Sequence, residues 1–79
     1  MITVLFFGPV AARVGQAELT FPASRGMTLQ HLHHDLQQRY PHAFELVCCT
    51  ALNGQMHHDL SQCVRAGDEV VFMSKFSGG

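Results

Sequence analysis

Hydrophobic residues in this chain gather in short runs that are separated by glycine, proline and other turn residues. The first run, residues 2–7, is β-branched and aromatic and stops at Gly8-Pro9, a pattern that predicts a strand. Residues 17–21 show a weak alternation of apolar and polar side chains and are bounded by Gly15 and Pro22. They predict a second strand that returns after the first. A short turn or a single helical turn is expected between them, around residues 10–14.

One stretch of the chain has the hydrophobic period of a helix. Thr28 is a suitable N-cap, and one helical stripe follows it, formed by Leu29, Leu32, Leu36 and Tyr40. Proline cannot continue the helical hydrogen bonds and disfavours helical conformation in the residue before it. The helix is therefore expected to stop near Tyr40, before Pro41.

Two further strands flank Asn53-Gly54, which is a strong hairpin signal. Residues 47–52 form the apolar run before it, and a short strand centred on Met56 follows it. Turn residues at 65–68 precede a last strand over residues 69–73. The order β-β-α-β-β-β predicts an α+β fold, a mixed sheet of four to five strands with one main helix packed on one face.

The length of 79 residues allows one domain, which we assign to residues 1–73, followed by a flexible C-terminal tail over residues 74–79. Five basic against six acidic side chains lack the positive surface that nucleic-acid binding needs. The apolar run at the start is far shorter than the ~20 residues of a membrane span. Three cysteines without a regular spacing favour a reducing compartment. We expect a cytoplasmic location and neither nucleic acid nor membrane as a partner.

Four segments together resemble a known family. They are Val4-Leu5-Phe6-Phe7, Ala51-Leu52-Asn53, Gly67-Asp68-Glu69-Val70 and the final Gly78-Gly79. In this order, and over nearly the whole chain, they resemble the β-grasp (ubiquitin-like) sulfur carriers, most of all the small subunit of molybdopterin synthase (MoaD/ThiS-like). Each segment is a weak signal, whereas the combination is fairly specific.

The resemblance implies a ubiquitin-like fold whose extended diglycine tail carries the chemistry. The carboxylate of Gly79 would be adenylated by a ubiquitin-activating-like enzyme and converted to a thiocarboxylate that donates sulfur, while Gly78 would give access to a narrow channel. The chain itself would be a protein co-substrate and not an enzyme. It would bind no cofactor, since ATP is used by the activating enzyme, and its second partner would be the large molybdopterin synthase subunit or another sulfur-accepting enzyme.

Two departures from the family pattern leave the pathway open. The segment after the last strand reads Ser74-Lys75-Phe76 where relatives commonly have prolines, and Ala11-Ala12 with a displaced Arg13 stands where an Arg-Glu pair is common. A thiamine, cysteine or natural-product pathway therefore remains an alternative acceptor. A second alternative is a ubiquitin-like interaction or conjugation module.

The strands also predict a surface for a partner protein. Thr3 and Glu69 mark the solvent-facing side of the first and last strands, yet both strands are apolar on both sides. We therefore predict an apolar patch on the face without the helix, formed by Leu5, Phe7, Met56, Val71 and Met73. Lys75 and Phe76 would extend this surface along the tail. The alternative is that loops or the chain's own tail cover these residues, with Phe76 folding back.

Histidines and cysteines supply candidate metal ligands. They fall in two groups, one of His31, His34 and Asp35 on the helix, the other of His57, His58 and Cys63. Neither has the spacing of a closed tetrahedral site, so we predict no metal and keep a metal carrier as a third hypothesis. Cys48 and Cys49 are adjacent in a strand and are expected to face opposite sides as buried hydrophobic residues.

Overall fold

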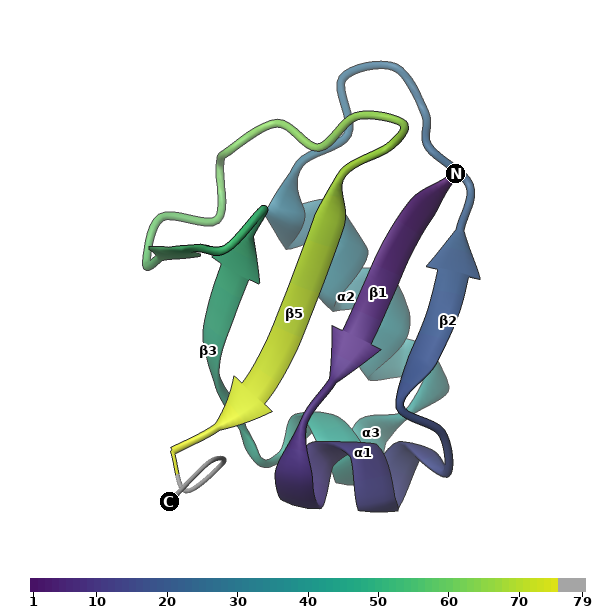
Figure 1. The fold of residues 1–79 in the computed structure, drawn as a ribbon, viewed down its shortest axis with the longest axis vertical. Coiled ribbons are helices and arrows are strands. Elements are labelled where there is room, and N and C mark those ends of the chain that lie inside the picture. Colours follow the sequence, from purple (N-terminus) through teal and green to yellow (C-terminus); the bar gives the residue numbers. More distant parts are fainter. Residues whose placement is uncertain (76–79) are drawn as a thin grey trace.

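Strands and helices follow one another along the chain in the computed structural model, which describes residues 1–75 (Figure 1). The elements are β1 (Ile2–Phe6), α1 (Gly8–Val14), β2 (Glu18–Phe21), α2 (Leu29–Arg39), α3 (Pro41–Phe44), β3 (Val47–Leu52), β4 (Gln55–His57) and β5 (Glu69–Ser74). The five predicted strands and the main helix are confirmed. Within residues 1–75 no helix is long and apolar enough to cross a membrane.

The strands form one five-stranded sheet in the order β2-β1-β5-β3-β4. The central pair, β1 and β5, is parallel, whereas the other neighbours are antiparallel. The predicted mixed sheet in an α+β fold is therefore confirmed. β5 lies in the middle of the sheet and continues one residue beyond its predicted end, because Ser74 still pairs with Val47 of β3.

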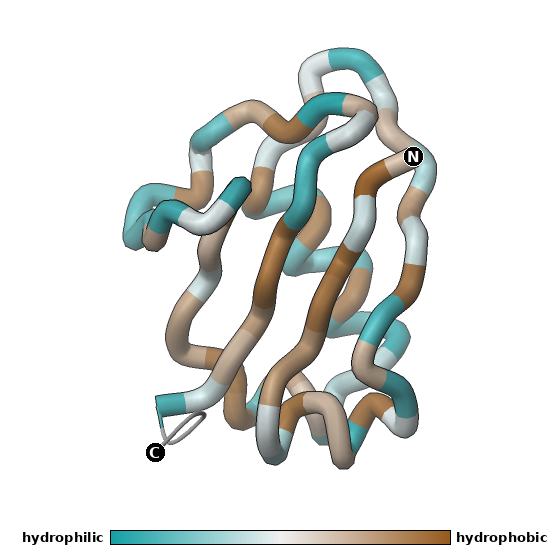
Figure 2. The backbone as a smooth tube through the Cα atoms, in the orientation of Figure 1, coloured by the Kyte–Doolittle hydropathy of each residue, from teal (hydrophilic) through white to brown (hydrophobic). Residues whose placement is uncertain are grey.

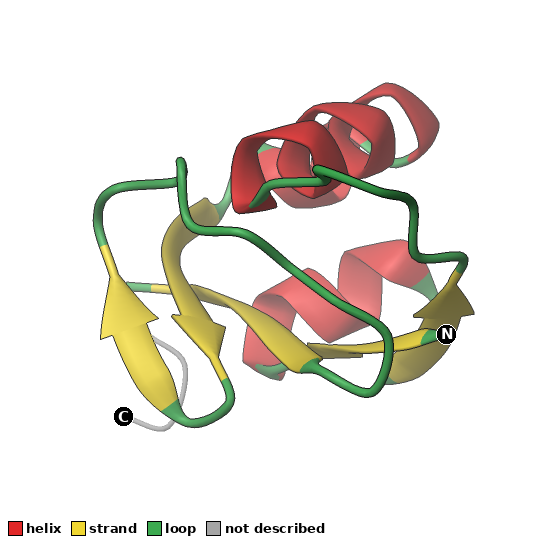
Figure 3. Ribbon diagram, turned by 90° about the horizontal axis from the view of Figure 1, so that it is seen from above, coloured by secondary structure: helices red, strands yellow, loops and turns green. Residues whose placement is uncertain are grey.

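The core lies between the sheet and the helices, which lie on one side of it (Figure 3). The predicted stripe of α2 supplies three fully buried side chains, Leu29, Leu32 and Leu36. They pack with side chains of the two central strands, including Phe6 and Phe72, whose stacked rings have centroids 6.2 Å apart. The core thus fixes the central strands against the helices.

The start of α2 is closed by a reciprocal cap. The hydroxyl of Thr28 accepts a hydrogen bond from the backbone N–H of His31 at 3.3 Å, and the Thr28 N–H donates to Nδ1 of His31 at 3.1 Å. Histidine here takes the role that glutamate usually has in a capping box. The predicted N-cap is confirmed, and His31 is given a structural role.

The chain contains more helix than the sequence pattern indicates. α1 covers two turns from Gly8 to Val14 and not one. Pro41 ends α2, as predicted, but also begins the short helix α3, which was not predicted. A proline is well tolerated in the first turn of a helix because its missing N–H would have no partner there.

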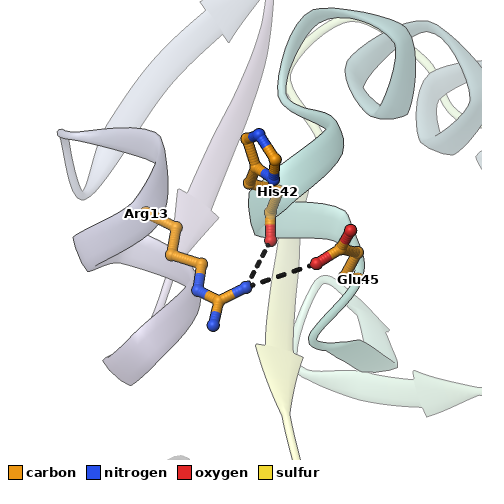
Figure 4. Close-up of polar contacts among 3 residues, drawn as sticks. All are labelled: Arg13, His42 and Glu45. Atoms are coloured by element: carbon orange, nitrogen blue, oxygen red, sulfur yellow. Dashed lines mark hydrogen bonds and ion pairs between the residues drawn. The ribbon is translucent and has the colours of Figure 1, made fainter.

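Arg13 joins α1 to the α3 region (Figure 4). Its Nη1 donates to the backbone carbonyl of His42 at 2.9 Å and lies 3.5 Å from a carboxylate oxygen of Glu45. Both charged side chains are well exposed, so the ion pair contributes less than about 1 kcal/mol to stability. The contact with the carbonyl still holds the helix that follows β1 in place.

Two turns at the far end of the sheet are bound to each other by side chains. Asn53, at a positive φ of 50°, donates from Nδ2 to Asp68 at 3.1 Å and accepts from the N–H of Glu69 at 2.9 Å. Asp68 also accepts from the N–H of Arg65 at 2.8 Å. These hydrogen bonds, first that from Arg65 and then that from Asn53, lower the pKa of Asp68. Asn53 and Asp68, which belong to two of the segments that carry the family resemblance, therefore hold the two turns together. We call this pair the clamp.

Candidate functional site

The base of the C-terminal tail lies where the central strand β5 ends. Ser74, the last residue of β5, is buried, and the exposed Lys75 follows it. The predicted reactive residues Gly78 and Gly79 and the predicted contact residue Phe76 lie outside the described residues. The structure thus shows where the tail leaves the sheet, at the end of β5.

One face of the sheet carries the side chains that point away from the helices. Val70 and Phe72 are fully buried in the core, so alternation along β5 places Val71 and Met73 on the opposite face. A single row of register partners crosses four strands on this face, formed by Leu5, Val71, Ala51 and Met56. The predicted assignment of side chains to the two faces agrees with this register.

Phe7 adds an aromatic ring to this face beyond the end of β1. Its backbone is extended, and its N–H donates to the carbonyl of Phe72 at 3.3 Å, so it continues the pairing with β5. Because Phe6 lies in the core, Phe7 falls on the other face. Its exposed fraction is 47%.

We call Leu5, Phe7, Met56, Val71 and Met73 the open-face patch. Met56 is 49% exposed, and Leu5 and Met73 are half-buried. The prediction of an exposed Val71 is wrong, since it is only 6% exposed. Val71 lies on the central strand between its register partners Leu5 and Ala51 and, because it is buried, contributes little area to the patch.

Polar residues border the open-face patch on the sides away from the tail. Leu5 has Glu18 of β2 as its register partner, and Thr3 lies between Thr20 and Glu69. Figure 2 shows β1 and β5 mostly brown, with hydrophilic colour at the start of β5. On this face Val71 and Met73 follow Glu69 along β5 toward Ser74, after which the tail begins.

Cys48 and Cys49 do not face opposite sides of the sheet as predicted. Two steps along β3, from Val47 to Cys49, match one step along β5, from Ser74 to Met73, so β3 contains a bulge at Cys48. The bulge breaks the alternation and brings the two Sγ atoms to 3.3 Å. The expectation of buried hydrophobic cysteines is also wrong, because Cys48 is exposed and Cys49 half-buried.

The histidines, which are candidate metal ligands, are not grouped as a metal site in the described residues, and one of them packs against aromatic rings. Among residues 1–75 no group of three or more His, Cys, Asp and Glu side chains is arranged to hold a metal ion. His33 packs its ring edge-on against Phe44 and Phe72, with centroid distances of 5.1 and 5.9 Å. Burial, and then the nearby His34, lower its pKa, because both disfavour the charged imidazolium.

One cavity lies at the other end of the sheet from the tail. Its volume is about 490 Å³, and it is bordered by residues 23–27 and 63–66. The segment 63–66 precedes β5, whereas the tail follows β5. This cavity is therefore separate from the open-face patch.

Comparison with known proteins identifies the family. The model of the ThiS family matches residues 4–79, which is nearly the whole chain and includes Gly78 and Gly79. The chain belongs to the ThiS family. No curated protein matches it.

Solved structures share the fold of this ThiS-family chain. A putative molybdopterin converting factor subunit 1 from Pyrococcus furiosus superposes with a TM-score of 0.81 at 18% identity and covers 92% of this chain and 94% of its own. SAMP1 from Haloferax volcanii gives 0.81 at 19% identity, with 99% and 98% covered. At these identities the likeness shows the β-grasp, ubiquitin-like fold, which confirms the predicted fold class.

A third structure is a protein complex. Subunit 1 and subunit 2 of the molybdopterin-converting factor from Helicobacter pylori were solved together, and the match has a TM-score of 0.72 at 26% identity, covering 99% of this chain and 97% of that one. Family and fold together make this chain a ThiS-type sulfur carrier with a β-grasp, ubiquitin-like fold.

Proposed function

We propose that this chain is a sulfur carrier whose C-terminal Gly79 is adenylated and then converted to a thiocarboxylate. We further propose that it donates this sulfur as the small, non-catalytic subunit of a molybdopterin synthase. The observation that carries the proposal is the ThiS family match over residues 4–79, which includes both glycines of the tail.

The chemistry follows from the properties of a terminal carboxyl group. With a pKa near 3.5 it is ionised at pH 7, and a carboxylate resists nucleophilic attack because oxide is a poor leaving group. Attack of the Gly79 carboxylate on the α-phosphate of ATP, with loss of pyrophosphate, gives an acyl adenylate. A sulfur nucleophile supplied by a donor then displaces AMP and leaves sulfur on the carbonyl carbon. The activating enzyme supplies the catalytic groups, so the chain is a co-substrate.

The fold supports this role by holding the start of the tail rigidly. β5 pairs with β1 over residues 69–72 and with β3 as far as Ser74, so backbone pairing fixes the strand up to the residue before Lys75. Four residues separate Lys75 from the end of the chain and extend at most about 14 Å. Glycine at the last two positions lets the backbone approach closely to an enzyme surface.

The open-face patch is the docking surface that we propose for the larger subunit. Its two most exposed members, Phe7 and Met56, offer apolar area on a face without a covering helix in residues 1–75. The Helicobacter pylori structure, in which the similar subunit is in complex with subunit 2, supports a partner of this kind. Lys75 adds a positive charge beside the patch for an acidic group of the partner.

Reconstitution tests the proposal. The full chain is incubated with a cognate activating enzyme, ATP and a sulfur donor, and its intact mass is measured. Replacement of one carboxylate oxygen by sulfur adds about 16 Da. Deletion of Gly79 is expected to abolish the mass gain, while a Gln38→Ala variant, changed on the exposed side of α2, is expected to load normally.

The same assay separates the alternatives. A product larger by the mass of a whole protein, joined through a lysine, indicates a ubiquitin-like modifier. Loading without sulfur transfer to a molybdopterin-forming large subunit places the carrier in another pathway, such as thiamine or cysteine synthesis. Normal loading of the Gly79 deletion contradicts the role of the C-terminus.

A further inference from the structure

Two thiols meet at the edge of the sheet beside the base of the tail. Cys48 and Cys49 have their Sγ atoms 3.3 Å apart and share a hydrogen bond. The bulge that brings them together lies opposite Met73 and Ser74, the last two residues of β5. Adjacent residues in a regular strand point to opposite faces, so this approach results from the bulge.

The pair is open to small reagents. β4 pairs only with residues 50–52 of β3, which leaves the Cys48 segment without a neighbouring strand on that side among the described residues. A cavity of about 120 Å³ adjoins Cys48 and is bordered by His33, His57 and His58, among others. Cys48 is exposed, and Cys49 is half-buried.

We propose that Cys48 and Cys49 are a redox modification site that forms a reversible intrachain disulfide. The Sγ atoms have to approach by about 1.3 Å to reach the length of a disulfide bond, about 2.05 Å. The Cα atoms of adjacent residues lie about 3.8 Å apart, closer than the 4.4–6.8 Å usual for disulfides, so the bond is strained and easily reduced. Strained bonds of this kind serve regulation and not stability.

The reaction needs a small-molecule disulfide, such as oxidised glutathione, as the oxidant. The thiolate of one cysteine attacks it, releases one glutathione thiolate and leaves a mixed disulfide on the protein. The thiolate of the second cysteine attacks the cysteine sulfur of this mixed disulfide, forms the bond between Cys48 and Cys49 and releases the second glutathione. The two thiol protons pass to the two glutathione molecules, and two electrons pass from the protein to the oxidant.

The reaction is expected to accelerate as the pH rises. The hydrogen bond with Cys49 is the largest cause of the raised pKa of Cys48, burial adds to it, and the charge of Lys75 opposes it. Since only thiolates attack disulfides, a larger thiolate fraction at alkaline pH increases the rate.

The test uses the full-length Cys63→Ser variant, in which the adjacent pair holds the remaining cysteines. The reduced protein is incubated with excess oxidised glutathione and cleaved before aspartate, which gives a fragment of residues 35–58. We expect most of this fragment to lose two hydrogens, about 2 Da, and to recover them with dithiothreitol. Cys48→Ser/Cys63→Ser and Cys49→Ser/Cys63→Ser are expected to retain a glutathione adduct of about 305 Da.

Three results would overturn the proposal. The Cys63→Ser variant could keep one or two glutathione adducts, form only dimers between chains, or stay fully reduced, and in each case the 2 Da loss is absent. Because serine replaces an exposed or half-exposed side chain in every variant, the fold is expected to persist, and circular dichroism checks this. The readout does not involve sulfur loading, so its result is independent of the proposed function.

Discussion

Truncation of Phe7 to alanine is the sharpest perturbation of the proposed docking surface. An aromatic side chain buries about 150–250 Å² when it is fully enclosed. With 47% of Phe7 exposed, about 90 Å² is available to a partner, of which alanine would still cover roughly a third. At about 25 cal/mol per Å² the loss is about 1.5 kcal/mol, or roughly a 10- to 15-fold increase in Kd.

Titration calorimetry with the purified large subunit measures this change. The buried half of Phe7 packs on its own sheet, so the variant is also expected to lose about 1–2 kcal/mol of folding stability. Binding is therefore compared well below the melting temperature of the variant, where both proteins are folded. Gln38→Ala, on the exposed side of α2, serves as the matched control and is expected to bind unchanged.

A second variant on the open-face patch tests whether the partner covers this face of the sheet. Met56→Ala, at the other side of the open-face patch with 49% exposure, is expected to weaken binding by a similar factor. The two losses are expected to add, because Phe7 follows β1 and Met56 lies in β4, and β5 and β3 separate these strands in the sheet. An increase in Kd of less than about twofold for both variants would show that the partner does not cover this face.

Three further changes test the fold that presents the tail. Asn53→Ala removes both clamp hydrogen bonds and leaves alanine at positive φ, so urea unfolding is expected to show a loss of about 1–2 kcal/mol, and Asn53→Gly a smaller one. The pKa of Asp68 is lowered in the folded state, so its stabilisation is present above the unfolded value, near 3.8, and is lost as the pH falls through the folded value. Asp68→Asn is therefore expected to flatten the acid side of the stability profile. Thr28→Ala removes the cap of α2 and is expected to cost about 1 kcal/mol in urea unfolding, whereas an unchanged midpoint would contradict the role of the cap.

Local patterns were sufficient to predict the elements whose signals lie within a few residues. The run at residues 2–7 ends at a glycine and a proline, and the leucine stripe of α2 starts at a capping threonine. α3 could not be predicted in this way, because Pro41 marks the end of one helix and gives no sign that it also begins another. The assignment of faces on β5 was correct because alternation is a local property.

The features that depend on partners distant in sequence could not be predicted. Val71 is buried between Leu5 and Ala51, which lie beside it only through the register of three strands. The bulge at Cys48 likewise exists only relative to β5, so the sequence suggested opposite faces where the structure brings two sulfur atoms together. The chemistry of the tail came from the resemblance to a family and not from any pattern of polarity.

The site of sulfur attachment tests the central claim most directly. After loading with ATP, the activating enzyme and the sulfur donor, fragmentation of the intact chain in a mass spectrometer locates the added mass. The account predicts a gain of about 16 Da confined to the fragment that ends at Gly79. A gain of about 32 Da on residues 35–58, as for a cysteine persulfide, with an unmodified C-terminus would contradict it.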